Sequence, residues 1–215
     1  MDELARLDAT ALAALVAARK VSPVELLDHA LAAVERLNPA LNAVVLVQEA
    51  VARASIARGL PVGPFRGVPF LIKDLGCEAR DFPAHNGSRL FANTRNTYDS
   101  AIFERMRATG VVTFGRTTSP EGGIGAATEA AVYGGPTRNP WNLDHTSVGS
   151  SGGSGAAVAA GIVPFAHGSD GGAAGPCPPG QPRGRAWRTG AFPSHDCPGS
   201  PPPPFSSLWR CICRS

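Results

Sequence analysis

This 215-residue chain lacks the features of an exported or membrane protein. It has no run of about 18 apolar residues, the length that a membrane-spanning helix requires. Its start, MDELARLD, is acidic and lacks the basic region that opens a signal peptide. Only one of five cysteines, Cys77, precedes residue 171, which argues against a disulfide framework in that part. We therefore expect a soluble protein located in the cytoplasm.

Several motifs for nucleotide and metal binding are also missing. No glycine run continues into the Walker A pattern G-x-x-x-x-G-K-[ST], and GGIGAATEAAVYGG does not complete G-x-G-x-x-G. No two histidines have the i, i+4 spacing of a helical zinc site, and the later cysteines lack paired C-x-x-C spacing. The sequence predicts no metal and no organic cofactor, although a glycine-rich helix start can still hold an anion.

The composition changes near residue 172. The part that follows holds ten of the chain's 20 prolines and four of its five cysteines. It has no helical or strand periodicity, and its composition is typical of a disordered segment. We therefore expect one ordered part over residues 1–172 and a Pro/Arg/Cys-rich tail, disordered or frameshifted, over residues 173–215.

Helix signals dominate the first 60 residues. The stretch SPVELLDHALAAVERLNP has Ser22 as N-cap, Pro23 at the first helical position and Glu25 to complete a capping box. Apolar residues then recur at helical spacing until Asn38 and Pro39, where we expect the helix to end. A similar apolar stripe predicts an earlier helix over about residues 9–19.

Short apolar runs separated by glycine and proline follow from Arg66. GVPFLIKDL and VVTFGRT are typical of buried strands, and DSAIFERMRATG between them of a helix that Gly110 closes. Two strands joined by a crossover helix predict a parallel pair, hence an α/β fold. SSGGSGAAVAAG then predicts a helix that ends at Gly161, and IVPFAH a further strand.

Lys73 interrupts the apolar run from Val68 to Leu75, in a chain with two lysines and 18 arginines. One interpretation is that its amine reaches the surface from the end of a strand. The other is that desolvation lowers its pKa, so that the neutral amine can accept a proton, which an arginine could not do.

The run SVGSSGGSGAAVAAG, residues 147–161, also has two interpretations. It could be a flexible linker, but it continues directly into AAVAAGIVPFA, which favours an ordered turn into a helix. Small residues in such a turn bring hydroxyls and backbone N–H groups close to a bound group, at the positive end of the helix dipole.

Four motifs together resemble the amidase signature family: GVPFLIKDL, GRTTSPE, GPTRNPWN and GSSGGSGAAVAAGIVPFAHGSD, in this order within residues 5–172. The resemblance implies a mixed sheet between helices and hydrolysis of carbon–nitrogen amide bonds by a Ser-Ser-Lys triad. It implies that Lys73 is the catalytic lysine and that Ser150, after a cis peptide, is the bridging serine. The other implied site residues are Gly149 and Ser151 in the site loop, and Gly171 and Gly172, whose backbone would form the oxyanion hole.

The family motif GSDxGGSIRxPA, which carries the nucleophile, is broken in this chain. GSDGG is present at residues 168–172, but AAGPCPPG follows. The nucleophile position, 24 residues after Ser150, holds Ala174, which has no hydroxyl. The resemblance thus implies an incomplete, truncated and inactive amidase domain, and a frameshift near Gly172 is our hypothesis for its cause. A sheet without its remaining strands is also expected to have an unpaired edge.

Two alternatives to a free-standing amidase stay open. One is an amidotransferase subunit of the same family. The other is a non-enzymatic protein that binds polyanions through the five arginines of the tail. For the leading interpretation the expected partner is a small-molecule amide substrate, with no nucleic acid and no membrane, and the sequence does not predict the oligomeric state.

Overall fold

A computed structural model describes residues 3–170, 188–190 and 208–213 of the chain. The α-helices are α1 (Ala9–Ala17), α2 (Pro23–Leu41), α3 (Glu49–Arg58), α4 (Ala101–Ala108) and α5 (Gly152–Ala159). Short 3-10 helices are η1 (Leu4–Arg6), η2 (Arg89–Phe91), η3 (Glu121–Gly123) and η4 (Ala131–Tyr133). The strands are β1 (Val44–Val47), β2 (Pro69–Lys73), β3 (Val112–Thr117), β4 (Arg138–Asn139), β5 (Asn142–Thr146), β6 (Phe165–Asp170), β7 (Arg188–Gly190) and β8 (Leu208–Cys213).

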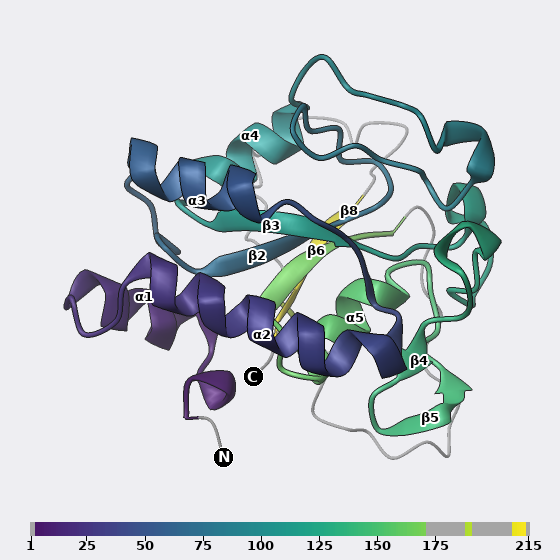
Figure 1. The fold of residues 1–215 in the computed structure, drawn as a ribbon, viewed down its shortest axis with the longest axis horizontal. Helices are drawn as coiled ribbons and strands as arrows, with labels where there is room; N and C mark the ends of the chain where they lie inside the picture. The colour runs from purple at the N-terminus through teal and green to yellow at the C-terminus, as the bar shows by residue number, and fades with distance from the viewer. Residues whose placement is uncertain (1–2, 171–187, 191–207, 214–215) are drawn as a thin grey trace, which may run out of the picture.

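The described strands form one mixed sheet and one hairpin (Figure 1). The sheet has six strands in the order β1-β3-β2-β6-β8-β7, and β4 pairs with β5 in the hairpin. β2 lies parallel to both β3 and β6, whereas β1 and β8 run antiparallel to their neighbours β3 and β6. The predicted α/β class and the parallel pairing of β2 with β3 are therefore confirmed.

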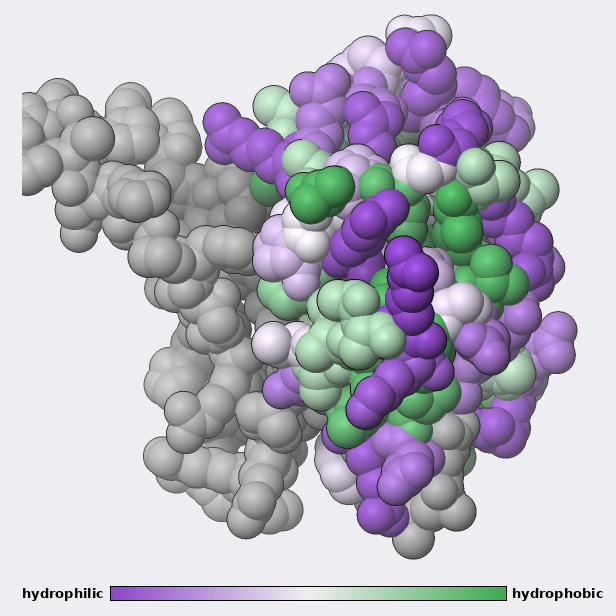
Figure 2. All heavy atoms as spheres, turned by 90° about the vertical axis from the view of Figure 1, so that its left-hand side faces the viewer, coloured by the Kyte–Doolittle hydropathy of each residue, from purple (hydrophilic) through white to green (hydrophobic). Residues whose placement is uncertain are grey.

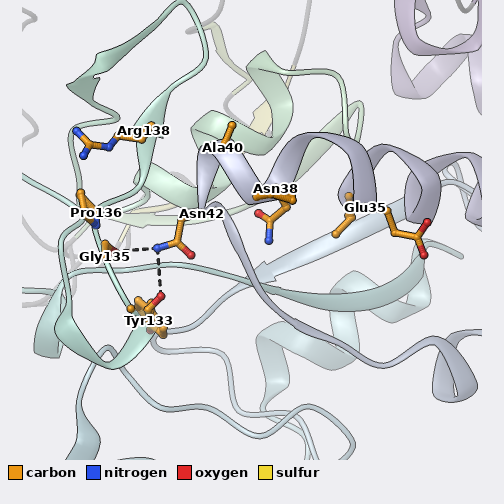
Figure 3. A pocket seen from close by; sticks show the side chains of 11 residues that line it. Glu35, Asn38, Ala40, Asn42, Tyr133, Gly135, Pro136 and Arg138 are labelled. Carbon is orange, nitrogen blue, oxygen red and sulfur yellow. Dashed lines mark hydrogen bonds between the residues drawn. The ribbon is translucent and has the colours of Figure 1, made fainter.

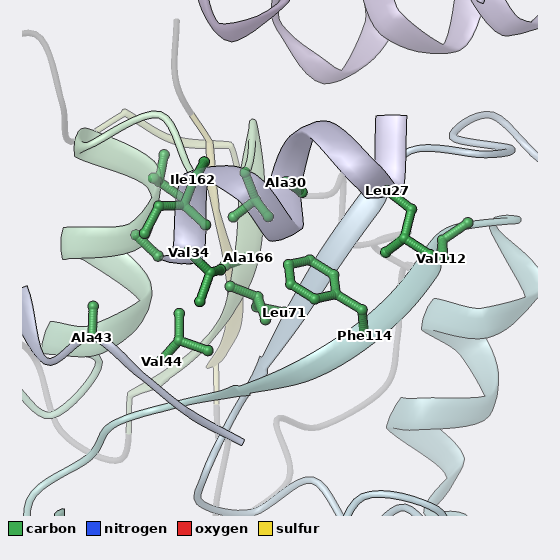
Figure 4. Close-up of a cluster of buried hydrophobic side chains, with 14 of the residues drawn as sticks. Leu27, Ala30, Val34, Ala43, Val44, Leu71, Val112, Phe114, Ile162 and Ala166 are labelled. Atoms are coloured by element: carbon green, nitrogen blue, oxygen red, sulfur yellow. The ribbon is translucent and has the colours of Figure 1, made fainter. Parts of the chain in front are cut away.

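Two hydrophobic clusters lie on opposite sides of β2, because successive strand residues point to opposite faces. Leu71 belongs to the cluster that contains Phe114 and the apolar stripe of α2 (Figure 4). Phe70 and Ile72 belong to the other cluster, to which α1 and α4 contribute. Burial on both sides explains why β2 reads as a continuous apolar run rather than an alternating one.

Helix α2 begins as predicted but ends later. The Ser22 hydroxyl accepts a hydrogen bond from Glu25 N–H, and the Glu25 carboxylate accepts one from Ser22 N–H, which completes the capping box. The helix continues through Pro39 to Leu41 and ends at Asn42, whose backbone is left-handed. A proline in the last turn removes only one helical hydrogen bond, so the helix can continue for two residues beyond it.

Several described elements were not predicted from the sequence. These are β1, α3, the β4–β5 hairpin, and the strands β7 and β8 beyond residue 172. β8 pairs antiparallel with β6 over six residue pairs, from Phe165 with Cys213 to Asp170 with Leu208. We expected an incomplete sheet to have an unpaired edge, but in the described residues the free side of β6 is paired with β8. An open strand edge offers N–H and C=O groups with which another segment of high strand propensity can pair.

Figure 2 shows the face of the molecule that lies at the left in Figure 1. Hydrophilic side chains cover much of this face, and hydrophobic ones lie between them. None of the helices in the described ranges is both long and apolar enough to span a membrane.

Candidate active site

Lys73 lies at the end of β2 and its side chain is completely buried. Its Nζ donates hydrogen bonds to Ser150 Oγ at 2.7 Å and to Ser169 Oγ at 3.0 Å. The carbonyl oxygen of Ser169 lies 3.4 Å from the same amine. The side chain thus turns inward to three oxygen atoms, and the interpretation of Lys73 as a lysine that reaches the surface is wrong.

Ser150 is held in a tight turn before α5. The peptide bond between Gly149 and Ser150 is cis, and Val148 before it has a positive φ of 66°. The glycines that follow allow close packing, because a Cβ at Gly152 would collide with Thr128 Oγ1 and one at Gly153 with Thr118 Oγ1. The Gly/Ser run is therefore an ordered turn into a helix, as its direct continuation into an apolar segment predicted.

Ser151 joins this turn to the end of β6. Its Oγ donates to the carbonyl oxygen of Ser169 and accepts a hydrogen bond from the Ser169 N–H, both at 3.1 Å. Ser169 thus contacts both Lys73 and Ser151, a role that the sequence analysis missed. The residue stood within the recognised GSD motif, but only the pairing of β2 with β6 brings its hydroxyl to the lysine.

His167 lies behind the site, completely buried on β6. Its Nδ1 accepts a hydrogen bond from the Lys73 backbone N–H at 3.3 Å, and its carbonyl oxygen accepts one from the buried Ser154 hydroxyl at 2.6 Å. Burial, with a smaller contribution from the nearby Arg116 charge, lowers the pKa of His167 to about 3. The imidazole is therefore neutral near pH 7, and its contact with the Lys73 backbone gives it a structural role.

A completely buried arginine, Arg116 on β3, supports the backbone around Lys73. Its Nη1 donates to the carbonyl oxygen of Lys73 at 2.8 Å. Its Nη2 donates to the carbonyls of Cys77 and Phe82, at 2.7 and 2.6 Å, and its Nε also donates to Phe82. One guanidinium thus ties the end of β2 to the segment that follows it.

Asp74 is the acidic partner of this arginine. The Asp74 side chain is 1% exposed, and its Oδ1 lies 3.9 Å from Arg116 Nε. Oδ1 also accepts the His85 N–H at 2.9 Å, and Oδ2 accepts the Tyr133 hydroxyl at 2.5 Å. Burial raises the pKa of Asp74, although the Tyr133 hydrogen bond and the Arg116 charge act in the opposite direction.

The pocket drawn in Figure 3 is separate from these groups. It has a volume of about 550 Å³ and lies between the C-terminal half of α2 and the segment from Tyr133 to Arg138. Asn42 lines the pocket and donates to the carbonyl oxygens of Tyr133 and Gly135, at 3.2 and 2.9 Å. Neither Lys73 nor Ser150 lines this pocket.

The structure brings together four of the predicted site residues: Lys73, Gly149, Ser150 and Ser151. Gly171, Gly172 and Ala174 lie outside the described residues. Within the described ranges, no group of three or more His, Cys, Asp or Glu side chains is arranged to hold a metal ion. Chemically, an amine within hydrogen-bond distance of a hydroxyl can exchange a proton with it, the first requirement for activating a serine.

Comparison with known proteins gives a consistent result. The family model described as Amidase matches residues 25–179. The chain is 43% identical over 165 residues to a 6-aminohexanoate-cyclic-dimer hydrolase of Paenarthrobacter ureafaciens. This match covers 76% of the chain and 33% of the relative. It is 40% identical to a glutamyl-tRNA(Gln) amidotransferase subunit of Mycolicibacterium paratuberculosis, with 79% of this chain and 36% of the relative covered.

Solved structures agree with these relatives. A structure of 6-aminohexanoate cyclic dimer hydrolase complexed with substrate superimposes with a TM-score of 0.74 and 41% sequence identity. The match covers 79% of this chain and 35% of the other. The chain therefore spans about a third of the length of the relatives that it matches.

Proposed function

Since this chain belongs to the amidase family, we propose that it derives from a hydrolase of carbon–nitrogen amide bonds in small molecules. In this proposal Lys73 and Ser150 are two members of a Ser-Ser-Lys relay. The observation that carries it is the hydrogen bond of 2.7 Å between the buried Lys73 amine and the Ser150 hydroxyl.

The burial of Lys73 supports a role as proton acceptor. Desolvation disfavours the charged form of an amine, so a buried lysine is neutral more readily than an exposed one. In the proposed relay, the neutral Lys73 amine takes the proton of the Ser150 hydroxyl, and Ser150 takes the proton of the nucleophilic hydroxyl. That hydroxyl attacks the amide carbonyl, and the same relay returns a proton to the leaving amine.

The oxygen of the tetrahedral intermediate would be stabilised by the backbone N–H groups of Gly171 and Gly172. In comparable sites one such donor lowers the activation free energy by about 3 kcal/mol. Gly149 and Ser151 belong to the turn that carries Ser150, and Ser151 ties that turn to β6. The relay requires no metal or organic cofactor.

We propose further that the chain as written does not hydrolyse amides. The expected position of the nucleophile holds Ala174, and an alanine has no hydroxyl to attack a carbonyl. We attribute this to a frameshift near Gly172, where the GSDGG motif passes into the segment rich in proline and arginine.

The nucleotide sequence of the gene and transcript across the codons for residues 167–180 tests the frameshift. We expect a one-base correction to restore serine at position 174, followed by an open frame of family length. The corrected product should hydrolyse a simple aryl amide, and Lys73→Met and Ser150→Ala should each abolish this activity. A transcript that confirms the frame as written, with no alternative frame encoding a GSIRxPA-like stretch, would contradict the frameshift.

The protonation of Lys73 can be tested in the present chain. Selective ¹³C labelling of lysine gives only two Cε signals, because Lys20 and Lys73 are the only lysines. We expect the Lys73 signal to titrate well below about 10.4, the value of an unperturbed lysine. A midpoint at or above that value would contradict its role as proton acceptor.

A second candidate is an amidotransferase subunit, which the 40% identity to such a subunit supports. The corrected product distinguishes the two functions. Hydrolysis of a small amide by the purified protein alone would support a free-standing amidase. Activity only in the presence of further subunits and an acceptor would support the amidotransferase.

A further inference from the structure

The Lys73 backbone and the Arg116 side chain form one buried unit. The guanidinium donates to the carbonyl of Lys73 itself, and its other hydrogen bonds go to Cys77 and Phe82, in the segment after β2. β2 and β3 are adjacent parallel strands, with Ile72 paired with Arg116 and Lys73 paired with Thr117. Arg116 therefore fixes the backbone at the end of β2, from which the Lys73 side chain extends.

A buried positive charge this close to Lys73 needs a partner. Asp74 supplies it, since its carboxylate lies 3.9 Å from Arg116 Nε and is itself buried. Two further donors, the Tyr133 hydroxyl and the His85 N–H, bind the same carboxylate and favour its charged form. The result is a compensated ion pair, of which the carboxylate belongs to the residue directly after Lys73 and the guanidinium to the adjacent strand β3.

We propose that Arg116 and Asp74 are positioning residues for Lys73. The opposite charges of Arg116 and Asp74 balance each other, so burial decides the protonation of the Lys73 amine and keeps it neutral. This inference rests on the proposed function of Lys73 as proton acceptor. It adds that removing either charge changes the titration midpoint of Lys73, and that the two changes have opposite signs.

The signs follow from simple electrostatics. Loss of the Arg116 charge leaves the Asp74 carboxylate uncompensated, which favours the ammonium form of Lys73 and raises its titration midpoint. Loss of the Asp74 charge leaves the Arg116 guanidinium uncompensated, which favours the neutral amine and lowers the midpoint. We expect the uncompensated charge to move the Lys73 midpoint by about one pH unit.

The other titratable groups around the pair change little in the relevant pH range. His167 on β6 is neutral because burial lowers its pKa to about 3. Burial raises the pKa of Cys77 to about 12, and burial also raises the pKa of Tyr133. The Glu78 charge acts on Arg116, and the His85 charge acts on Asp74, so both side chains need a control.

The experiment is the ¹³C-lysine titration of the full chain and its variants, with the exposed Lys20 as internal reference. We expect Asp74→Asn to lower the Lys73 midpoint by about one pH unit and Arg116→Met to raise it by about one. Arg116→Lys keeps the charge but adds a third labelled Cε signal, which is identified by comparison with the spectrum of the original chain. The Lys73 midpoint should stay within a few tenths of a unit of the original.

Control variants separate this effect from general changes in charge. Asp28→Asn removes a carboxylate that pairs with Arg53 on the surface, and it should not move the Lys73 signal. His85→Gln and Glu78→Gln, each combined with Asp74→Asn, should leave the downward shift in place. A shift that disappears in either background would assign the effect to that neighbour and overturn the inference.

A purely structural role for the pair predicts a different result. Both variants would then be less stable, but the Lys73 midpoint would stay unchanged or move in one common direction, and either outcome overturns the inference. If Arg116→Met does not fold, Asp74→Asn decides alone. An asparagine has nearly the same shape as the aspartate, its oxygen can still accept from the His85 N–H, and its NH2 group can donate to the Tyr133 hydroxyl oxygen.

The inference and the proposed function can fail separately. A wild-type Lys73 midpoint near about 10.4 contradicts the proposed base even if the variants shift it in opposite directions. A low wild-type midpoint that neither variant moves supports the base but overturns the role of Arg116 and Asp74.

Discussion

At the scale of single residues, the centre of this protein contains several buried polar groups that contact one another. The Ser154 hydroxyl lies 2.7 Å from the Thr117 hydroxyl and donates to the carbonyl of His167. Such groups are costly to bury unless they are hydrogen-bonded, so each one restricts how β3, β6 and α5 can pack. The same contacts place the Lys73 amine and the Ser150 hydroxyl within hydrogen-bond distance.

His167 should make the protein sensitive to acid. Its folded pKa of about 3 lies below the unfolded value of about 6.5, so the unfolded state binds more protons between these values. Stability is therefore fully present above about pH 6.5 and falls as the pH is lowered toward about 3, by up to about 1.4 kcal/mol per pH unit. We expect His167→Gln to remove most of this dependence of stability on pH. The measurement is the free energy of unfolding from urea denaturation between pH 4 and pH 7, at steps of about half a pH unit.

The exposed histidine of the hairpin, His145, provides the control. His145→Gln should keep the wild-type slope. Asp74 acts in the opposite sense, because a raised pKa in the folded state costs stability as the pH rises, but all three proteins share this contribution. Equal slopes for the wild type and His167→Gln would contradict the assignment.

At the scale of elements, local sequence signals explain where the longest helix begins. The capping box of Ser22 and Glu25 satisfies two backbone donors at the start of α2. We expect Ser22→Ala to lower the free energy of unfolding by about 1 kcal/mol, measured by urea denaturation at pH 7. Thr10→Ala, at an exposed position of α1, is the matched control and should cost less. Equal losses would mean that the cap is not responsible.

Other elements depend on close contact between chain segments. A Cβ at Gly115 on β3 would collide with the carbonyl oxygen of Leu46 on β1, which is backbone and cannot rotate away. We expect Gly115→Ala to lower the free energy of unfolding by about 3 kcal/mol, measured by thermal and urea unfolding. Gly135→Ala should be nearly neutral, because no atom lies within 4 Å of the added Cβ. Similar stability of the two variants would show that β1 tolerates the displacement.

At the scale of the whole molecule, the two hydrophobic clusters share the sheet and should unfold together. Leu27 is completely buried in one cluster and Phe103 is 5% exposed in the other. We expect Leu27→Ala and Phe103→Ala each to cost about 3 kcal/mol and to shift one common transition. Hydrogen exchange of peptides from each cluster should show the same loss of protection. Two separate transitions would indicate that the clusters are independent units.

The α/β class and the amidase family membership could both be predicted from the sequence. Helix α2 is indicated by Ser22, Pro23 and its apolar stripe, and β2 and β3 by short buried runs between turn residues. These signals are local, so they can be read without knowledge of the neighbours. The short β1 and the β4–β5 hairpin were missed because their pairing partners, rather than their own few residues, make them strands.

The sequence by itself determined the principal elements, and by resemblance it pointed to Lys73, Ser150 and the missing hydroxyl at Ala174. Only the tertiary structure decided which groups meet. Ser169 reaches the Lys73 amine because β6 lies beside β2, and Arg116 reaches the Lys73 carbonyl because β3 lies on its other side. The physical reason is that such contacts join residues far apart in the chain. The strand–helix–strand pattern predicts that β2 and β3 pair, but the register of that pairing and the position of β6 beside β2 depend on the packing of the whole sheet.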